Sequence, residues 1–131
     1  MSRRLFAVLV VSCGLLGLLA SPQAHHSFAA EYDRDKPVTL TGAVTKVEWT
    51  NPHVYFYIDA KDSNEKVTNW AVELGAPAYL VRAGWKKEML PIGASVTIAG
   101  SLARNGSSRV NASTVTLDGK KLFAGSSGDA K

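Results

Sequence analysis

The three histidines are the residues of this chain whose types best suit metal chemistry, and they fall in two places. His25 and His26 stand side by side, and His53 follows an Asn-Pro pair. If the chain were cut before His25, its free amine and ring nitrogen would chelate one cation, and His26 or His53 would add a third nitrogen. Amine and imidazole ligands in a tetragonal set favour Cu(II). The spacing therefore permits a copper site, although solvated histidines at a cleavage junction would give the same pattern.

A second candidate site lies on one strand, where polar and aromatic side chains alternate with apolar ones. The polar set is His53, Tyr55 and Tyr57, and the apolar set is Val54, Phe56 and Ile58. Alternation of this kind predicts a strand with one face in the core and the other turned outward. Outward tyrosines stack on small ligands or contact another protein. They are also good strand formers that residues 25–37 could cover, which would bring His25 or His26 towards His53.

Motifs of the common catalytic centres are missing from the sequence. It has no Gly-x-Ser-x-Gly elbow, no phosphate-binding glycine loop and no His-Glu-x-x-His helix. Three acids, Glu48, Asp59 and Glu73, could in principle join His53 in acid–base chemistry, but their positions in the sequence give no reason for them to converge. The sequence therefore favours a binding function over an enzymatic one.

The first 24 residues have the pattern of a secretory signal peptide. Arg3 and Arg4 precede an unbroken apolar run that ends at Leu19, and small residues follow. We expect cleavage after Ala24, with Ala20 as the alternative site. The apolar run is shorter than the roughly 20 residues of a membrane span, so we expect no retained anchor. These features predict a periplasmic protein.

Only one cysteine, Cys13, is present, and it lies inside this apolar run. Its surroundings loosely resemble a lipoprotein cleavage site, but apolar and small residues continue beyond it, so an ordinary apolar role is the favoured interpretation. Removal of residues 1–24 would leave no thiol and would lower the net charge from +4 to +2. A chain so weakly basic is not expected to bind nucleic acid.

The segment from Val38 to Asp59 predicts two long strands joined by a corner at Pro52, and the other elements can be placed against it. In the first of these strands the apolar residues change parity between Val44 and Val47. One extra residue near Thr45 or Lys46 would account for the change, so we expect a β-bulge there, with Gly42 easing the bend.

The remaining elements complete a small barrel. We expect a third strand at 67–74, a helix from Pro77 to Ala83, a fourth strand at 95–103, a fifth at 111–117 and a short return at 121–123 after an Asp118-Gly119 turn. The order of three strands, one short helix and two further strands matches an oligonucleotide/oligosaccharide-binding (OB) barrel. The expected division is an arm at 25–37, an all-β OB-like barrel of five or six strands at 38–123, and a disordered tail at 124–131.

Several segments also carry a resemblance to a known family. The segments are HHSFAAEYD, KPVTLTGAVTKVEWTNPHVYFYID, NWAVELG, the Gly84-Trp85 pair and KLFAGSS. They resemble a bacterial family of small exported proteins of unknown function, and the similarity runs from His25 to about Ser127. The resemblance implies a periplasmic OB-like barrel, and it brings no activity and no functional residues.

The sequence favours a periplasmic binding module that holds a small ligand on the outer face around His53, Tyr55 and Tyr57. One alternative is a copper-binding or copper-delivery protein that uses His25, His26 and His53. The other is a structural accessory subunit that binds an envelope protein.

Overall fold

Strand β1 (Tyr32–Glu48) is the longest strand of the computed structural model, which describes residues 27–125. The other elements, in chain order, are α2 (Phe28–Glu31), β2 (Tyr55–Lys61), β3 (Val67–Glu73), α3 (Pro77–Arg82), the 3-10 helix η2 (Lys87–Met89), β4 (Ser95–Ala103), β5 (Arg109–Leu117) and β6 (Lys120–Phe123). The expected signal peptide, His25, His26 and residues 126–131 lie outside the described part of the chain.

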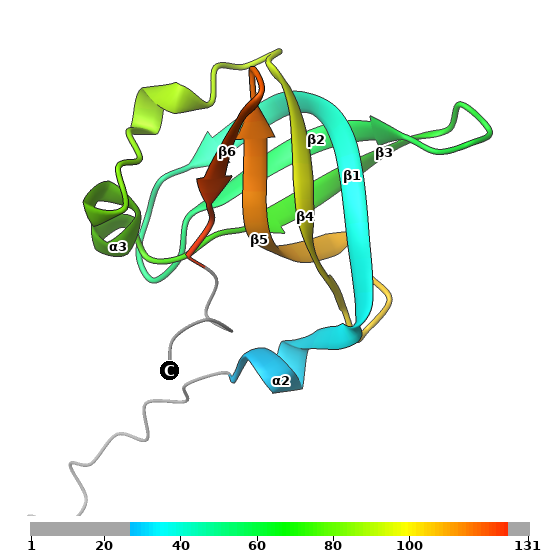
Figure 1. The fold of residues 1–131 in the computed structure, drawn as a ribbon. Helices are drawn as coiled ribbons and strands as arrows, with labels where there is room; N and C mark the ends of the chain where they lie inside the picture. The colour runs from blue at the N-terminus through cyan, green and yellow to red at the C-terminus, as the bar shows by residue number, and fades with distance from the viewer. Residues whose placement is uncertain (1–26, 126–131) are drawn as a thin grey trace, which may run out of the picture.

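The six strands form one sheet that closes on itself (Figure 1). The strand order is β3-β2-β1-β4-β5-β6, and β3 also pairs with β5. That last pairing is parallel, from Ala71 opposite Arg109 to Glu73 opposite Asn111, and all other pairings are antiparallel. A closed five-strand circuit with α3 between β3 and β4 is the OB-like arrangement. The predicted fold class is confirmed.

A bulge in β1 lets this strand serve both sides of the barrel. Val44 pairs with Ile58 and Lys46 with Tyr57, so Thr45 is the extra residue, as the change of parity predicted. Gly42 lies so close to β2 that a Cβ there would contact the carbonyl oxygen of Asp59. The first part of β1 pairs with β4 and the second with β2, which is why one strand reaches both halves of the sheet.

The core fills with the inward side chains that the alternation predicted. Fully buried members are Val54, Phe56, Ile58, Val72, Leu74, Leu80, Ile98, Val110 and Val115, with Trp85 only 2% exposed. Trp49 and Trp70 are partly buried against the same core. Leu80 and Trp85 cover one end of the barrel, and the Trp85 indole donates to the carbonyl of Phe123 at 2.8 Å. Tyr79 of α3 is not part of this cover and is 43% exposed.

Both ends of the expected barrel domain differ from the sequence analysis. Strand β1 begins at Tyr32, so the second half of the expected arm belongs to the sheet, and the helix α2 precedes it. At the other end Ala124, which we expected in the tail, is fully buried, and its carbonyl accepts from the amide of Gly75 at 2.9 Å. Both differences arise because the two segments lack strand alternation in the sequence and are ordered by packing against the barrel.

Other local expectations hold. Asp118 and Gly119 both have positive φ, 50° and 74°, as a tight two-residue hairpin requires. The Asn51-Pro52 peptide bond at the predicted corner is cis. Between residues 27 and 125, none of the helices has the length and apolar character needed to span a membrane.

Candidate functional site

A buried carboxylate, Glu73, organises the polar cluster on the outer face of the barrel. Its neighbours along the chain, Val72 and Leu74, are fully buried in the core, so Glu73 points the other way. It is nevertheless only 3% exposed. Tyr55 of β2 and Asn111 of β5 stand opposite Glu73 in the two flanking strands, so all three side chains share this face.

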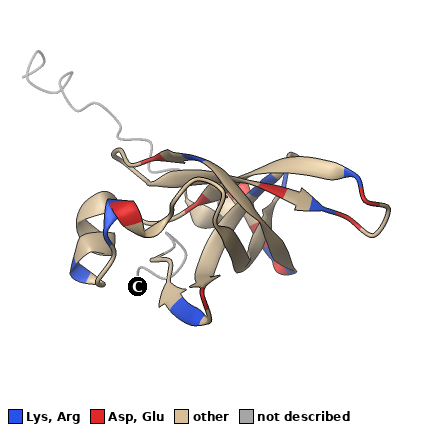
Figure 2. Cartoon of the chain, turned by 90° about the horizontal axis from the view of Figure 1, so that it is seen from above, with Lys and Arg blue, Asp and Glu red and all other residues tan. Residues whose placement is uncertain are grey.

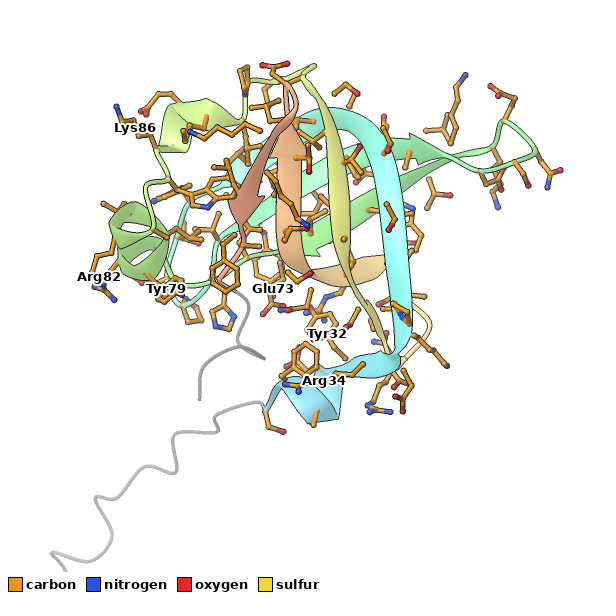
Figure 3. All side chains as sticks on the ribbon, in the orientation of Figure 1. Tyr32, Arg34, Glu73, Tyr79, Arg82 and Lys86 are labelled. Carbon is orange, nitrogen blue, oxygen red and sulfur yellow. The ribbon has the colours of Figure 1, made fainter. Side chains whose placement is uncertain are left out.

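Four side chains approach the Glu73 carboxylate. Nδ1 of His53 lies 2.7 Å from Oε1, and the Tyr55 hydroxyl donates to Oε2 at 2.6 Å. The Tyr32 hydroxyl also donates to Oε2, and Nη2 of Arg109 lies 3.4 Å from the same oxygen. Figure 3 shows Tyr32 and Glu73 close together between α2 and the strands. A buried carboxylate needs such partners, because burial without them would be very costly.

Arg109 joins this cluster to the segment that precedes the barrel. Its Nη2 lies 3.2 Å from Oε2 of Glu31 and 2.9 Å from the Tyr32 hydroxyl oxygen. The Tyr32 ring stacks on Phe28 with 5.7 Å between ring centroids. Nearby, Nε of Arg104 donates to the carbonyl of Ala29 at 2.8 Å. The residues just after His26 are therefore held against the polar cluster.

The two tyrosine hydroxyls of the cluster are held in their protonated form. Burial, reinforced by the hydrogen bond to Glu73, raises the pKa of Tyr55 to about 12. The same two causes, in the same order, raise the pKa of Tyr32 well above its usual range. Both hydroxyls consequently act as hydrogen-bond donors to the carboxylate at neutral pH.

His53 is the member of the cluster with a ring nitrogen left for a ligand. Its side chain is 31% exposed, and the contact of Nδ1 with Glu73 assigns the Nδ1–H tautomer to the neutral ring. Nε2 then carries the lone pair, and it has no hydrogen-bond partner within residues 27–125. Histidines that bind metals commonly donate their other ring N–H to a carboxylate in this way.

The structure brings together two of the three residues predicted for the ligand face. His53 and Tyr55 meet at Glu73, whereas the Tyr57 hydroxyl donates to Oε2 of Glu48 at 3.0 Å. Of the acids considered with His53, only Glu73 contacts it. Asp59 of β2 instead accepts a hydrogen bond from the side-chain amide of Asn69 in β3 at 2.7 Å.

Tyr32, Arg109 and Asn111 are members of the site that the sequence analysis did not identify. Asn111 is 2% exposed, and neither atom of its carboxamide has a partner in the described part of the chain. Buried side-chain amides are usually hydrogen-bonded, so Asn111 is an exception, and it stands opposite Glu73 in the neighbouring strand. The sequence signal available for Glu73 was its position between two core residues, but that pattern marks an outward residue and not a buried one.

A shallow hollow of about 310 Å³ borders the cluster, lined by Ala30, Glu31, Arg104, Asn105 and Arg109. Its two arginines already contact acids, since Nη1 of Arg104 lies 3.3 Å from Oδ2 of Asp33. Within residues 27–125 no three His, Cys, Asp or Glu side chains are grouped so as to hold a metal ion. His25 and His26 lie outside that range, so their predicted role stays a prediction.

A family model matches residues 14–112, which is most of the chain, and its description is a family of unknown function, DUF6152. The chain belongs to this family. The predicted membership of a family of unknown function is therefore confirmed. DUF6152 carries no residue roles that could be transferred to His53 or Glu73.

Comparison with solved structures finds the N-terminal domain of the PriB protein from Thermoanaerobacter tencongensis, whose structure is described as dimeric. The two chains are 18% identical, and the match covers 63% of this chain and 96% of the other with a TM-score of 0.42. The comparison with curated proteins finds no match.

Proposed function

We propose that this DUF6152 protein is an exported, periplasmic binding module that holds a small ligand against His53 and Tyr55. The signal-like first 24 residues support the compartment. The observation that carries the binding role is the contact of His53 Nδ1 with Oε1 of Glu73 at 2.7 Å, which fixes the ring and leaves Nε2 for a ligand. Tyr57 lies on the same face of β2 and extends the predicted contact surface.

The surroundings of Glu73 favour binding over catalysis. Its two oxygens already face His53, Tyr32, Tyr55 and Arg109, so the chain's own side chains enclose the carboxylate and it does not face a substrate. A saturated carboxylate serves instead to orient its partners. Glu73 is therefore a positioning residue, and His53 is the group that contacts the ligand.

Native mass spectrometry of protein taken directly from the periplasm tests the binding role. The wild type is expected to carry an additional mass that His53→Gln loses and Tyr79→Phe, at an exposed tyrosine outside this site, retains. An unliganded wild type, with the same mass profile as His53→Gln, would contradict a ligand at this position. Recovery of a stoichiometric envelope protein by both the wild type and His53→Gln would favour the accessory-subunit role instead.

Copper binding is a second candidate, favoured by the orientation of His53. The carboxylate–imidazole pair has the form found behind metal-bound histidines, and α2, which the cluster anchors, begins two residues after His26. A mature chain that starts at His25 would add its amine and ring nitrogens to Nε2 of His53. Such a nitrogen set suits Cu(II).

Two measurements test the copper site. Mass spectrometry of the exported protein determines whether His25 is its first residue. A Cu(II) titration then compares this protein with a form that carries one extra N-terminal alanine and with Glu73→Gln. The extra residue should weaken binding, and Glu73→Gln should weaken it by about 10- to 100-fold because His53 loses its orienting partner. Equal affinity in all three would exclude the site.

A further inference from the structure

The side of the barrel formed by α3, η2 and β6 exposes apolar side chains that the polar cluster does not use. Tyr79 and Val81 of α3 are 43% and 59% exposed, and Phe123 of β6 is 45% exposed. The rings of Tyr79 and Phe123 lie 6.3 Å apart, which joins the helix and the strand into one surface. We refer to these three residues, with Arg82, Lys86, Lys87, Lys120 and Lys121, as the aromatic–basic surface.

Positive charge gathers on this side of the molecule. Residues 77–93 and 118–125 hold five Lys and Arg and two acids, whereas the other residues between 27 and 125 hold seven Lys and Arg and eight acids. Figure 2 shows blue segments on the two short helices and at β6, and Figure 3 shows Tyr79, Arg82 and Lys86 on the same side. The net positive charge of the described chain therefore resides here.

The cations of this surface are also available to a partner. Elsewhere four cations form ion pairs with acids, including Lys46 with Glu48 at 2.5 Å and Lys61 with Glu65 at 2.6 Å; the other two are Arg104 and Arg109. None of the five cations of the aromatic–basic surface forms an ion pair with a described residue. Unpaired cations around exposed aromatic rings present both charge and apolar contact to one partner.

We propose that the aromatic–basic surface docks on the headgroups of an anionic lipid membrane. Lysine and arginine near a membrane are attracted to anionic headgroups, and aromatic rings prefer the boundary between headgroups and acyl chains. A protein partner fits less well, because lysine is depleted from protein interfaces and charged residues from their cores. The surface combines the basic and the apolar side chains that interfacial membrane binding uses. These side chains come from α3, η2 and β6 and not from one long amphipathic helix.

Docking of this kind places the candidate ligand site near the membrane. The amide of Gly75 donates to the carbonyl of Ala124 at 2.9 Å, and the carbonyl of Gly75 accepts from the amide of Val54 at 3.0 Å. Through Gly75, the end of β6 thus lies beside the residue that follows His53. The membrane contact does not depend on the ligand proposed for His53, and the two fail separately.

Co-sedimentation of the full chain with lipid vesicles tests the proposal. Vesicles of phosphatidylglycerol and phosphatidylcholine are compared with vesicles of phosphatidylcholine alone. The wild type and all variants carry the same residues 1–24, so any contribution of that segment, Arg3 and Arg4 included, is common to them. The wild type is expected to prefer the anionic vesicles, and the preference should fall with added salt. Binding that does not distinguish the two vesicles would overturn the proposal.

Two matched triple variants separate a local surface from net charge. Neutralising Arg82, Lys86 and Lys87 to glutamine should weaken anionic-vesicle binding about a hundredfold, as expected for three basic residues at a charged membrane. Neutralising Lys46, Lys61 and Lys66 removes the same charge elsewhere and should leave binding nearly unchanged. Equal losses in both would show attraction by net charge only and would refute the docking surface.

The apolar contribution has its own test. Val81→Ser removes an exposed side chain outside the core, so it should reduce vesicle binding without altering thermal unfolding. Unchanged binding in Val81→Ser, together with unchanged binding in the Arg82, Lys86 and Lys87 variant, would assign this side to another partner, whether a protein or a polyanion.

Discussion

Nδ1 of His53 lies 2.7 Å from Oε1 of Glu73, and the Glu73 side chain is only 4% exposed while that of His53 is 31% exposed. The pair therefore connects the interior of a polar cluster to its surface. Tyr32 of β1 and Tyr55 of β2 contact the other carboxylate oxygen, so one acid of β3 holds three strands in a fixed relation to the imidazole.

Replacement of Glu73 by glutamine is expected to destabilise the fold by about 2 to 4 kcal/mol, because buried donors lose their charged acceptor and Arg109 loses a counter-ion. Urea denaturation measures the change. Glu48→Gln is the matched control, and it should have less effect because the Glu48 side chain is 38% exposed and that of its partner Lys46 is 60% exposed. Equal midpoints for the two variants would show that the cluster contributes little to stability.

Stability should fall in alkali through the tyrosines of the cluster. Burial, followed by the hydrogen bond to Glu73, raises the pKa of Tyr55 from 10.0 to about 12. A group whose pKa is higher in the folded state stabilises the fold fully below its unfolded pKa. That contribution is lost as the pH rises from about 10 through about 12.

Urea denaturation at a series of alkaline pH values checks this expectation. Tyr55→Phe should lower stability near neutral pH and flatten the alkaline decline, and Tyr79→Phe, which removes an exposed hydroxyl, serves as the control. A decline as steep in Tyr55→Phe as in the wild type would assign the alkaline loss to other groups.

Asn111→Leu should leave stability unchanged or raise it by about 1 kcal/mol. The buried carboxamide has no partner within residues 27–125, and replacing an unsatisfied polar group by an apolar one of similar shape removes a desolvation cost. Thermal unfolding measures the effect, with Asn69→Leu as a control that breaks the side-chain hydrogen bond to Asp59. A clear loss of stability in Asn111→Leu would indicate that the amide is satisfied in solution by a water or a ligand.

Gly42→Ala should destabilise the barrel by about 1 to 3 kcal/mol, since the added Cβ would push β1 away from the Asp59 carbonyl. The neighbouring Thr41→Ala is a suitable comparison because its hydroxyl bonds Thr97 on an exposed face. Denaturation midpoints of the two variants provide the measurement. Equal and small effects would mean that the strands adjust at this crossing.

The fold could be predicted from the sequence wherever a local pattern determined it. The change of parity in β1 predicted the bulge at Thr45, and Asp118-Gly119 predicted the last hairpin. Strand β4 has the expected bounds, because its alternating residues are flanked by clear turn signals. In each case the information lies within a few residues of the feature.

The candidate site could be predicted only in part, because it depends on residues that are distant in the sequence. Glu73 lies between two core residues, which is the pattern of an outward side chain, but its burial results from Tyr32 and Arg109, which come from other elements. Parity along the strand grouped Tyr57 with Tyr55. In the structure, however, Tyr57 stands opposite Lys46 of β1, and the Tyr57 hydroxyl donates to Glu48. Contacts of this kind follow from the register of the paired strands and from the closure of the barrel. Neither can be inferred from a few neighbouring residues of the sequence.

The parallel seam between β3 and β5 consists of three residue pairs, from Ala71 with Arg109 to Glu73 with Asn111. Its two strands are separated along the chain by α3, η2 and β4, so pairing them closes a long loop and costs conformational entropy. That cost is smaller once the antiparallel hairpins have formed and have brought the strands together. The seam should therefore form late during folding. Until it does, β3 and β5 each offer an unpaired edge to neighbouring chains, and Glu73 at the end of that seam places a charge where such intermolecular pairing would begin.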